Sequence, residues 1–291
     1  MLFHSSYTAL LTPFKDNQLD INAYRNLVDF QIENGTHGLV PVGTTGESPT
    51  LSHDEHKKLV EVCVEQANGR VPVIAGAGSN STSEAVDFVK HACAAGADGL
   101  LVVTPYYNKP TQSGLLAHYN ELIKNSSKPI IIYDIPGRSV IKMSHNTVAE
   151  LAKNDLIVGV KDATADLARP TRLQNLIGDD FIQLSGEDGT ALAYLAAGGH
   201  GCISVTANIA PNLLSRMHNA WKQDDIANAQ DINKKLMPLH DSLFCETSPG
   251  PLKYAASLLG ICSSEARLPI VESEELSKKN VDNALKTAGI R

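Results

Sequence analysis

The sequence predicts an α/β fold, a (β/α)8 TIM barrel followed by a C-terminal appendage of three helices. Two observations indicate this fold. Short apolar runs of strand length recur about every 20–35 residues as far as residue 205, and segments with helical patterns and helix-start signals lie between them. One run and the helix after it make one strand–helix unit, and eight such units in succession close into a barrel of about 225 residues.

The apolar runs are mostly rich in Val, Ile and Leu, which is typical of strands buried on both faces of a parallel sheet. In chain order they are Tyr7–Leu11, Gly38–Val42, Val71–Ala75, Gly99–Val103, Pro129–Tyr133, Leu156–Val160, Phe181–Leu184 and Gly201–Val205. Capping boxes, in which a serine and a glutamate three residues later satisfy each other's backbone donors, predict helix starts at Ser52 and Ser81. A doubly wound open sheet is the alternative, but no G-x-G-x-x-G fingerprint follows the first run.

The pattern changes after about residue 224, because no strand-like run follows. The remaining chain is predicted to form three helices, Ile226–Phe244, Pro249–Leu259 and Glu274–Thr287. Residues 1–224 are therefore predicted to form the catalytic barrel and residues 225–291 a helical region that packs on it. This region is not expected to be an independent domain, because its 67 residues make only a modest core alone.

Composition and charge exclude several classes of function. The chain has 291 residues, of which 43% are hydrophobic and 20% charged, and its net charge of −7 argues against a nucleic-acid or anionic-membrane partner. No apolar run approaches the roughly 20 residues that span a bilayer, and the N-terminus lacks the basic start of a signal peptide. The five cysteines are far apart and have no metal-binding spacing. We therefore expect a cytoplasmic protein.

A lone lysine, Lys161, ends the apolar run Leu156–Val160, and polar residues follow it at once. Apolar surroundings disfavour the charged ammonium form of a lysine, and a neutral amine is a nucleophile that forms Schiff bases with carbonyl substrates. The alternative is a strand-end lysine whose amine reaches water along its apolar stem. Because barrel active sites lie at the C-terminal ends of the strands, the residues that follow the other runs decide between these interpretations.

Hydroxyl and arginine side chains follow several of the other runs. They include Thr44, Thr45, Thr104, Tyr106, Tyr107, Tyr133, Arg138 and Thr206. At one barrel mouth with Lys161, hydroxyl groups could relay the protons that imine chemistry requires, and backbone N–H groups of the Gly-Thr-Thr-Gly turn could hold a carboxylate. Adjacent tyrosines cannot both face the barrel interior, so one of the two is expected to point away from it.

Two motifs identify a family resemblance. Residues 38–47 read GLVPVGTTGE, and residues 133–138 read YDIPGR, the latter beginning 28 residues before the lysine of the segment VKDAT. Over essentially its whole length the chain resembles the 4-hydroxy-tetrahydrodipicolinate synthase (dihydrodipicolinate synthase) family, within the pyruvate-dependent class I aldolases. The resemblance implies a lyase that joins pyruvate to L-aspartate 4-semialdehyde, at the entry to lysine and diaminopimelate biosynthesis. It implies no metal and no organic cofactor.

The resemblance also implies catalytic roles for four residues. Lys161 condenses with pyruvate, Tyr133 donates and accepts protons beside it, and Thr44 and Tyr107 complete a proton relay. In the family, the tyrosine that matches Tyr107 enters from the neighbouring subunit, so the site would need a dimer. The family usually forms a homotetramer, a dimer of dimers.

Four further positions are implied to bind substrate. Thr45 would hold the carboxylate of pyruvate, the backbone at Ile203 would face the bound pyruvate, and Gly186 would lie near the same pocket. Arg138 would receive the carboxylate of the second substrate, which an arginine fork suits well. Neuraminate lyases lack this arginine, so Arg138 argues against the alternative of a sugar-acid aldolase of the 2-keto-3-deoxygluconate or N-acetylneuraminate lyase type.

A second site is implied at the dimer interface, where L-lysine inhibits bacterial and plant members of the family. The matching positions are Ser48, Pro49, Leu51, His53, His56, Gly78, Asn80, Glu84 and Tyr106. Glu84 could pair with an ammonium group and Asn80 could bind a carboxylate, although an ordinary helix N-terminus is the alternative here. His53 and His56 lack a third ligand for a metal. A remote alternative for the whole chain is a non-catalytic barrel that binds lysine.

Overall fold

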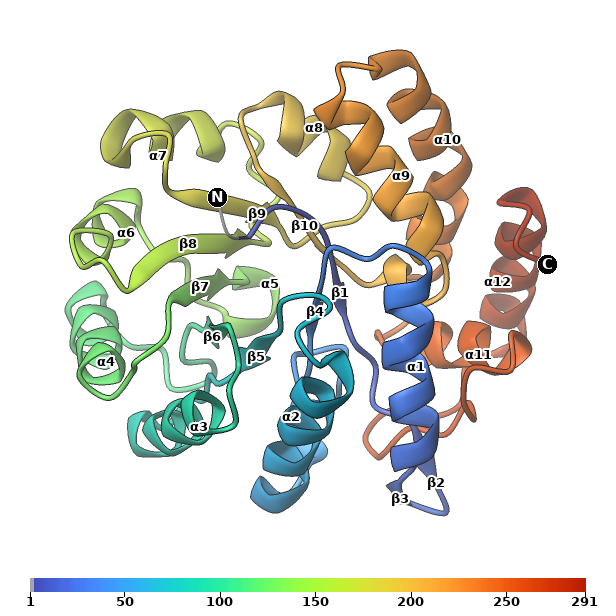
Figure 1. Ribbon diagram of the computed structural model, residues 1–291, viewed down its shortest axis with the longest axis horizontal. Helices are drawn as coiled ribbons and strands as arrows, with labels where there is room; N and C mark the ends of the chain where they lie inside the picture. The colour runs from blue at the N-terminus through green and yellow to red at the C-terminus, as the bar shows by residue number, and fades with distance from the viewer. Residues whose placement is uncertain (1–2) are drawn as a thin grey trace. The chain divides into compact units, whose positions relative to one another are not determined.

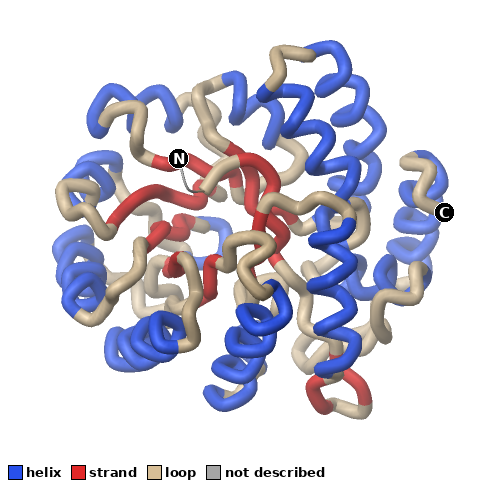
Figure 2. Tube along the Cα trace, in the orientation of Figure 1, coloured by secondary structure: helices blue, strands red, loops and turns tan. Residues whose placement is uncertain are grey.

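The computed structural model describes residues 3–291 of the chain. The chain forms two compact units. The first, called the central unit, consists of Pro72–Ile203 and the residues up to His4. The second, called the flanking unit, consists of Ser5–Val71 and Ser204–Arg291. Figure 1 shows the chain by residue number, and Figure 2 shows its helices and strands.

The central unit is a parallel sheet with helices between its strands. The strands pair in sequence order, so each crossover returns to the next position in the sheet. They are β5 (Ile74–Gly76), β6 (Gly99–Val103), β7 (Ile130–Asp134), β8 (Ile157–Asp162), β9 (Ile182–Ser185) and β10 (Gly201–Ser204). The helices are α3 (Thr82–Ala94), α4 (Gln112–Lys124), α5 (Pro136–Ser139), α6 (His145–Leu151), α7 (Arg169–Ile177) and α8 (Ala191–Ala196). In Figure 1 the longer helices α3, α4, α6 and α7 lie outside these strands.

The flanking unit combines the first strands of the chain with its last helices. Strands β1 and β4 are parallel, and Tyr7 lies opposite Gly38, where a Cβ would fall 2.0 Å from the tyrosine ring. The elements before the central unit are β1 (Ser5–Ala9), β2 (Phe14–Lys15), β3 (Gln18–Leu19), α1 (Ile21–Glu33), β4 (Gly38–Val40), η1 (Ser48–Thr50) and α2 (His53–Ala67). Those after it are η2 (Thr206–Asn208), α9 (Pro211–Lys222), α10 (Ile226–Ser242), α11 (Gly250–Leu258) and α12 (Glu275–Thr287).

The predicted strands and C-terminal helices are confirmed, with shifts of a few residues at their ends. All eight apolar runs overlap a strand of the parallel sheet, and the three predicted helices are α10, α11 and α12. The second run gives a strand that already ends at Val40, because Val42 takes a φ of +50° and turns the chain. The antiparallel hairpin of β2 and β3, at the start of α1 in Figure 2, was not predicted. The domain boundary at residue 224 stays a prediction.

The two predicted capping boxes have different outcomes. At the start of α2, Ser52 Oγ accepts the N–H of Glu55, and the Glu55 carboxylate accepts the N–H of Ser52, as predicted. At the start of α3 the box does not form. There, Ser79 Oγ accepts the N–H of Ser81 at 3.0 Å and donates to the Glu84 carboxylate. Ser81 and Glu84 therefore each bond with Ser79 and not with one another.

Within residues 3–291, no helix has both the length and the apolar character that crossing a lipid bilayer requires.

Candidate active site

The register between β7 and β8 decides which residues meet at the candidate site. Ile130 lies opposite Ile157, and the register then shifts by one residue. Without this shift Tyr133 would lie opposite Val160, whose side chain points to the other face of the sheet. With it, Tyr133 lies opposite Lys161, and both side chains stand on the same face.

Tyr133 and Lys161 are buried and in contact. Their exposed fractions are 6% and 5%, and the lysine Nζ lies 4.2 Å from the centroid of the tyrosine ring. The lysine side chain is therefore almost wholly covered, which argues against the alternative of a strand-end lysine that extends into solvent. An amine held beside a phenol can attack a carbonyl carbon while the phenol donates and accepts the protons of imine formation.

Gly186 leaves room for the lysine side chain. A Cβ at this position would lie 3.2 Å from Lys161 Cε and 2.8 Å from Ala163 Cβ, so any larger residue would displace the lysine. The N–H of Gly186 donates to the carbonyl oxygen of Asp162 at 2.7 Å, which holds the end of β9 against the end of β8. The structure thus brings the predicted Gly186 to the lysine.

The carboxyl group of Glu187 was not predicted as part of the site. Burial raises its pKa most, and Asp188 raises it further, whereas Lys161 and Arg138 act in the opposite direction. This carboxyl group therefore lies near both Lys161 and Arg138. Its signal in the sequence is its position directly after Gly186 at the end of a strand.

The other predicted residues of the central unit differ in exposure. Ile203 in β10 is fully buried. Arg138 lies on the short helix α5, directly after β7, and is exposed. Tyr107 follows β6, has a φ of +72° and is 86% exposed. The phenol of Tyr107 therefore projects to solvent from the single chain, whereas Tyr133 and Lys161 face one another.

Thr44 and Thr45 lie in a tight turn of the flanking unit. The N–H of Gly46 donates to Gly43 O and the N–H of Glu47 donates to Thr44 O, each at 3.1 Å. Thr45 is buried and Thr44 is half-buried. Glu47 ends the turn with a φ of +55°, in the left-handed region that residues other than glycine seldom adopt. The two hydroxyl groups therefore sit on a backbone that two turn hydrogen bonds define.

Four residues of the predicted lysine site belong to the central unit, and three of them gather around the start of α3. Burial raises the pKa of Tyr106, the nearby carboxylate of Glu84 raises it further, and a hydrogen bond with the backbone of Asn80 lowers it. Gly78 packs against β6, because a Cβ there would lie 2.4 Å from the backbone nitrogen of Val103. Tyr106 and Glu84 thus lie near one another, and Tyr106 also bonds with the backbone of Asn80.

The other five predicted residues of that site belong to the flanking unit. Ser48 and Pro49 lie on η1, Leu51 directly follows it, and His53 and His56 lie in the first turn of α2. His56 is buried and His53 is exposed. The two histidines thus differ in environment.

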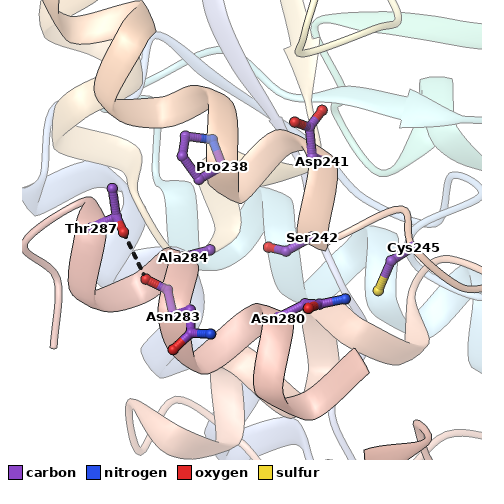
Figure 3. Close-up of a pocket in the computed structure, with 8 residues that line it drawn as sticks. All are labelled: Pro238, Asp241, Ser242, Cys245, Asn280, Asn283, Ala284 and Thr287. Carbon is purple, nitrogen blue, oxygen red and sulfur yellow. Dashed lines mark hydrogen bonds between the residues drawn. The ribbon is translucent and has the colours of Figure 1, made fainter. Parts of the chain in front are cut away.

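Two surface cavities lie in the flanking unit, and the predicted catalytic residues line neither of them. The first has a volume of about 350 Å³ and lies between α10 and α12 (Figure 3). It is lined by Pro238, Asp241, Ser242, Cys245, Asn280, Asn283, Ala284 and Thr287. The second, of about 560 Å³, is lined by Asn17, Thr50, Glu265, Ala266, Arg267 and Leu268.

Parallel strands that alternate with helices, with a buried lysine beside a tyrosine at the strand ends, are typical of lyases of the class I aldolase type. The sequence model of the dihydrodipicolinate synthetase family matches residues 2–288. The chain belongs to this family.

Individual relatives agree with this assignment. A 4-hydroxy-tetrahydrodipicolinate synthase of Rhodospirillum centenum is 57% identical over 289 residues, which cover 99% of each sequence. The chloride-inhibited dihydrodipicolinate synthase of Acinetobacter baumannii, solved with pyruvate, is 40% identical with a TM-score of 0.96, and all of both chains is covered. The enzyme of Cyanidioschyzon merolae, solved with lysine bound, is 35% identical with a TM-score of 0.96, covering 100% of this chain and 99% of that one. The fold is thus the (β/α)8 barrel that was predicted.

Proposed function

We propose that this protein condenses pyruvate with L-aspartate 4-semialdehyde, through an imine at Lys161, to form 4-hydroxy-tetrahydrodipicolinate. The observation that carries the proposal is the buried amine of Lys161 beside the phenol of Tyr133, in a member of the dihydrodipicolinate synthetase family. The relative from Acinetobacter baumannii, whose structure contains pyruvate, supports this choice of first substrate.

The chemistry follows from an amine and a phenol held together. The Lys161 amine adds to the keto carbon of pyruvate, and the resulting carbinolamine loses water to give the imine. Loss of a methyl proton turns the imine into an enamine, whose carbon attacks the aldehyde of the second substrate. The amino group of that substrate then displaces the lysine and closes the ring, which releases the amine. Tyr133 is the group placed to move protons in these steps.

The remaining roles are inferred from the family. Thr45 would hold the pyruvate carboxylate, Thr44 and Tyr107 would continue the proton relay from Tyr133, and Arg138 would bind the carboxylate of the semialdehyde. The site would need no metal or organic cofactor, because the protonated imine itself activates the substrate. An exposed Tyr107 fits a phenol that acts in a neighbouring subunit of a homotetramer.

Reductive trapping tests the proposed reaction directly. Borohydride added with pyruvate should attach the substrate irreversibly to Lys161, and a coupled assay with both substrates should show turnover. Lys161→Ala should abolish both signals while its circular dichroism spectrum stays unchanged. A wild-type protein that forms no adduct, or a Lys161→Ala variant that turns over normally, would contradict the proposal.

The proposed role of Tyr107 can be tested by mixing two inactive variants. If each active site takes its tyrosine from the partner subunit, Tyr107→Phe and Lys161→Ala chains refolded together should recover part of the activity. Either variant refolded alone should recover none. Equal activity in mixed and unmixed samples, with mixed oligomers shown by mass spectrometry, would place the tyrosine in its own chain's site.

Regulation by L-lysine is proposed for the residues around Glu84 and Tyr106, supported by the lysine-bound relative from Cyanidioschyzon merolae. The Glu84 carboxylate suits the ammonium group of the inhibitor. Lysine added to the coupled assay should lower turnover, and Glu84→Gln or His56→Ala should weaken this inhibition without altering basal turnover. A wild-type enzyme that excess lysine does not inhibit would refute regulation of this kind.

A further inference from the structure

Behind the lysine and the tyrosine, the central unit buries one arginine between two aspartates. Arg169, the first residue of α7, is 0% exposed, and its Nη2 lies 2.7 Å from Oδ2 of Asp134. Its Nη1 donates to Oδ1 of Asp162 at 3.2 Å. The two carboxylates are 0% and 2% exposed. We call these three residues the Arg169 clamp.

The clamp acts on the two strands that carry the reacting groups. Asp134 directly follows Tyr133, Asp162 directly follows Lys161, and each pair lies at the same level of the sheet. Successive side chains of a strand point to opposite faces. Tyr133 and Lys161 therefore stand on one face, while the aspartates reach the clamp on the other.

Further hydrogen bonds fix both aspartates. The backbone N–H of Met143 donates to Asp134, with a shortest distance of 3.2 Å. Asp162 accepts the N–H of Thr164 at 3.0 Å and the hydroxyl of Tyr194 at 3.4 Å. Each carboxylate thus has partners besides the arginine, so neither is free to rotate. These bonds tie the ends of β7 and β8 to one another on the side opposite the lysine and the tyrosine.

The clamp carries one positive and two negative charges in a region closed to water. Burial raises the pKa of Asp134 most, the Arg169 guanidinium opposes that effect, and the second carboxylate adds to it. An ion group of this kind is weak evidence for stability alone, since an apolar replacement of the same volume is often as stable. A role in geometry explains its position better than a role in stability.

We propose that Arg169 is a positioning residue, which holds the Tyr133 phenol and the Lys161 amine at their reactive separation by joining the strand positions directly after them. A planar guanidinium binds the two carboxylates through separate nitrogens in fixed directions, whereas the rotatable ammonium of a lysine sets no such geometry. The proposal rests on the proposed function, since it assigns the clamp to imine formation at Lys161.

The test compares Arg169→Lys with the matched control Arg172→Lys. Arg172 lies on the same helix but is 54% exposed and pairs at the surface with Asp166. The rate of reductive trapping of pyruvate should fall about 10- to 100-fold in Arg169→Lys, because small displacements of reacting groups carry effects of this size. The control should trap pyruvate at the wild-type rate. If Arg169→Lys does not fold, Asp134→Asn takes its place, since it breaks one arm of the clamp and keeps the side-chain volume.

A second background separates positioning from general damage. In Tyr133→Phe protein the phenol is absent, so the clamp no longer sets the separation between a phenol and the Lys161 amine. Arg169→Lys should then change the trapping rate less than about threefold. An equal loss in both backgrounds, or a wild-type trapping rate in Arg169→Lys, would overturn the inference. Absence of any adduct in unsubstituted protein would instead overturn the proposed function, and this inference with it.

Discussion

Two buried groups of charged residues, one in each unit, hold the segments that carry the predicted site, and they are built differently. In the Arg169 clamp one guanidinium lies between two carboxylates, and all three side chains are at most 2% exposed. In the flanking unit Lys253 pairs with Glu47 and Arg267 pairs with Glu55. We call these four residues the Lys253 cluster. The clamp is closed to water and has one more negative than positive charge. The cluster has equal numbers of positive and negative charges and is partly open to water.

The Lys253 cluster ties the segment after α11 to the Thr44–Thr45 turn. Lys253 is fully buried, pairs with the Glu47 carboxylate that ends the turn, and donates to Glu265 O at 2.6 Å. The N–H of Arg267 donates to the same Glu47 carboxylate at 3.0 Å. The C-terminal part of the chain therefore supports a turn that lies far before it in sequence.

The difference lies in the distance along the chain over which each group acts. Asp162 and Arg169 are 7 residues apart, whereas Glu47 and Arg267 are 220 residues apart. The clamp therefore fixes local geometry between two adjacent strands. The cluster closes a long loop and fixes where the end of the chain lies. Damage to the clamp should therefore show in both chemistry and stability, whereas damage to the cluster should show mainly in stability.

Loss of the arginine charge should have the largest effect on stability. Arg169→Met leaves two carboxylates buried without their cation, and removing one partner of a buried ion pair costs about 3–5 kcal/mol. The free energy of unfolding should fall by about 5 kcal/mol, measured by urea denaturation at fixed subunit concentration. The double variant Arg169→Met/Asp134→Asn should recover part of the loss. If Arg169→Met were as stable as wild type, the two carboxylates would not both be charged.

Loss of the lysine in the flanking unit should cost somewhat less, because it leaves one unpaired carboxylate and not two. Lys253→Met should lower the free energy of unfolding by about 3 kcal/mol, and Glu47→Gln in the same chain should restore most of it. Lys286→Met, an exposed lysine on α12, is the control and should change stability by less than about 0.5 kcal/mol. A similar small change in Lys253→Met would show that the cluster does not contribute to stability.

The comparison also shows which parts of the site could be predicted from sequence. Lys161 and Tyr133 could be predicted because each ends an apolar run, and strand ends meet at one edge of a parallel sheet. The β7–β8 register shift that sets them face to face leaves no mark in either run. Arg169 and Lys253 resemble ordinary helical residues of their segments in sequence, and only the packing shows that both are fully buried.

The same limit applies to polar contacts at short range. Ser81 and Glu84 have the spacing of a capping box, but Ser79, two residues earlier, takes both of their bonds. The local pattern was correct about where α3 begins and wrong about the partners. Element positions thus follow from periodicity and caps, whereas the partner of a given side chain depends on which groups compete within reach.

The smallest effect on stability should come from the partly exposed pair of the Lys253 cluster, Arg267 and Glu55, and should depend on pH. The Arg267 guanidinium lowers the pKa of Glu55 from 4.5 to about 2, mainly through side-chain hydrogen bonds. Because the folded pKa is the lower one, the stabilisation is present above pH 4.5 and is lost as the pH falls toward 2. Solvent screening limits it to about 1 kcal/mol.

Glu55→Gln should therefore lower the free energy of unfolding at pH 7 by about 1 kcal/mol and remove that part of the acid dependence below pH 4.5. Urea midpoints measured from pH 2.5 to pH 7 provide the test, since the wild-type and variant curves should converge at the acid end. Glu121→Gln is the control, because Glu121 pairs with Lys124 at the surface of α4 and should leave the curves nearly unchanged. Curves for Glu55→Gln that stay parallel to wild type across this range would mean that Arg267 does not hold the carboxylate, and the flanking cluster would then consist of the Lys253–Glu47 pair alone.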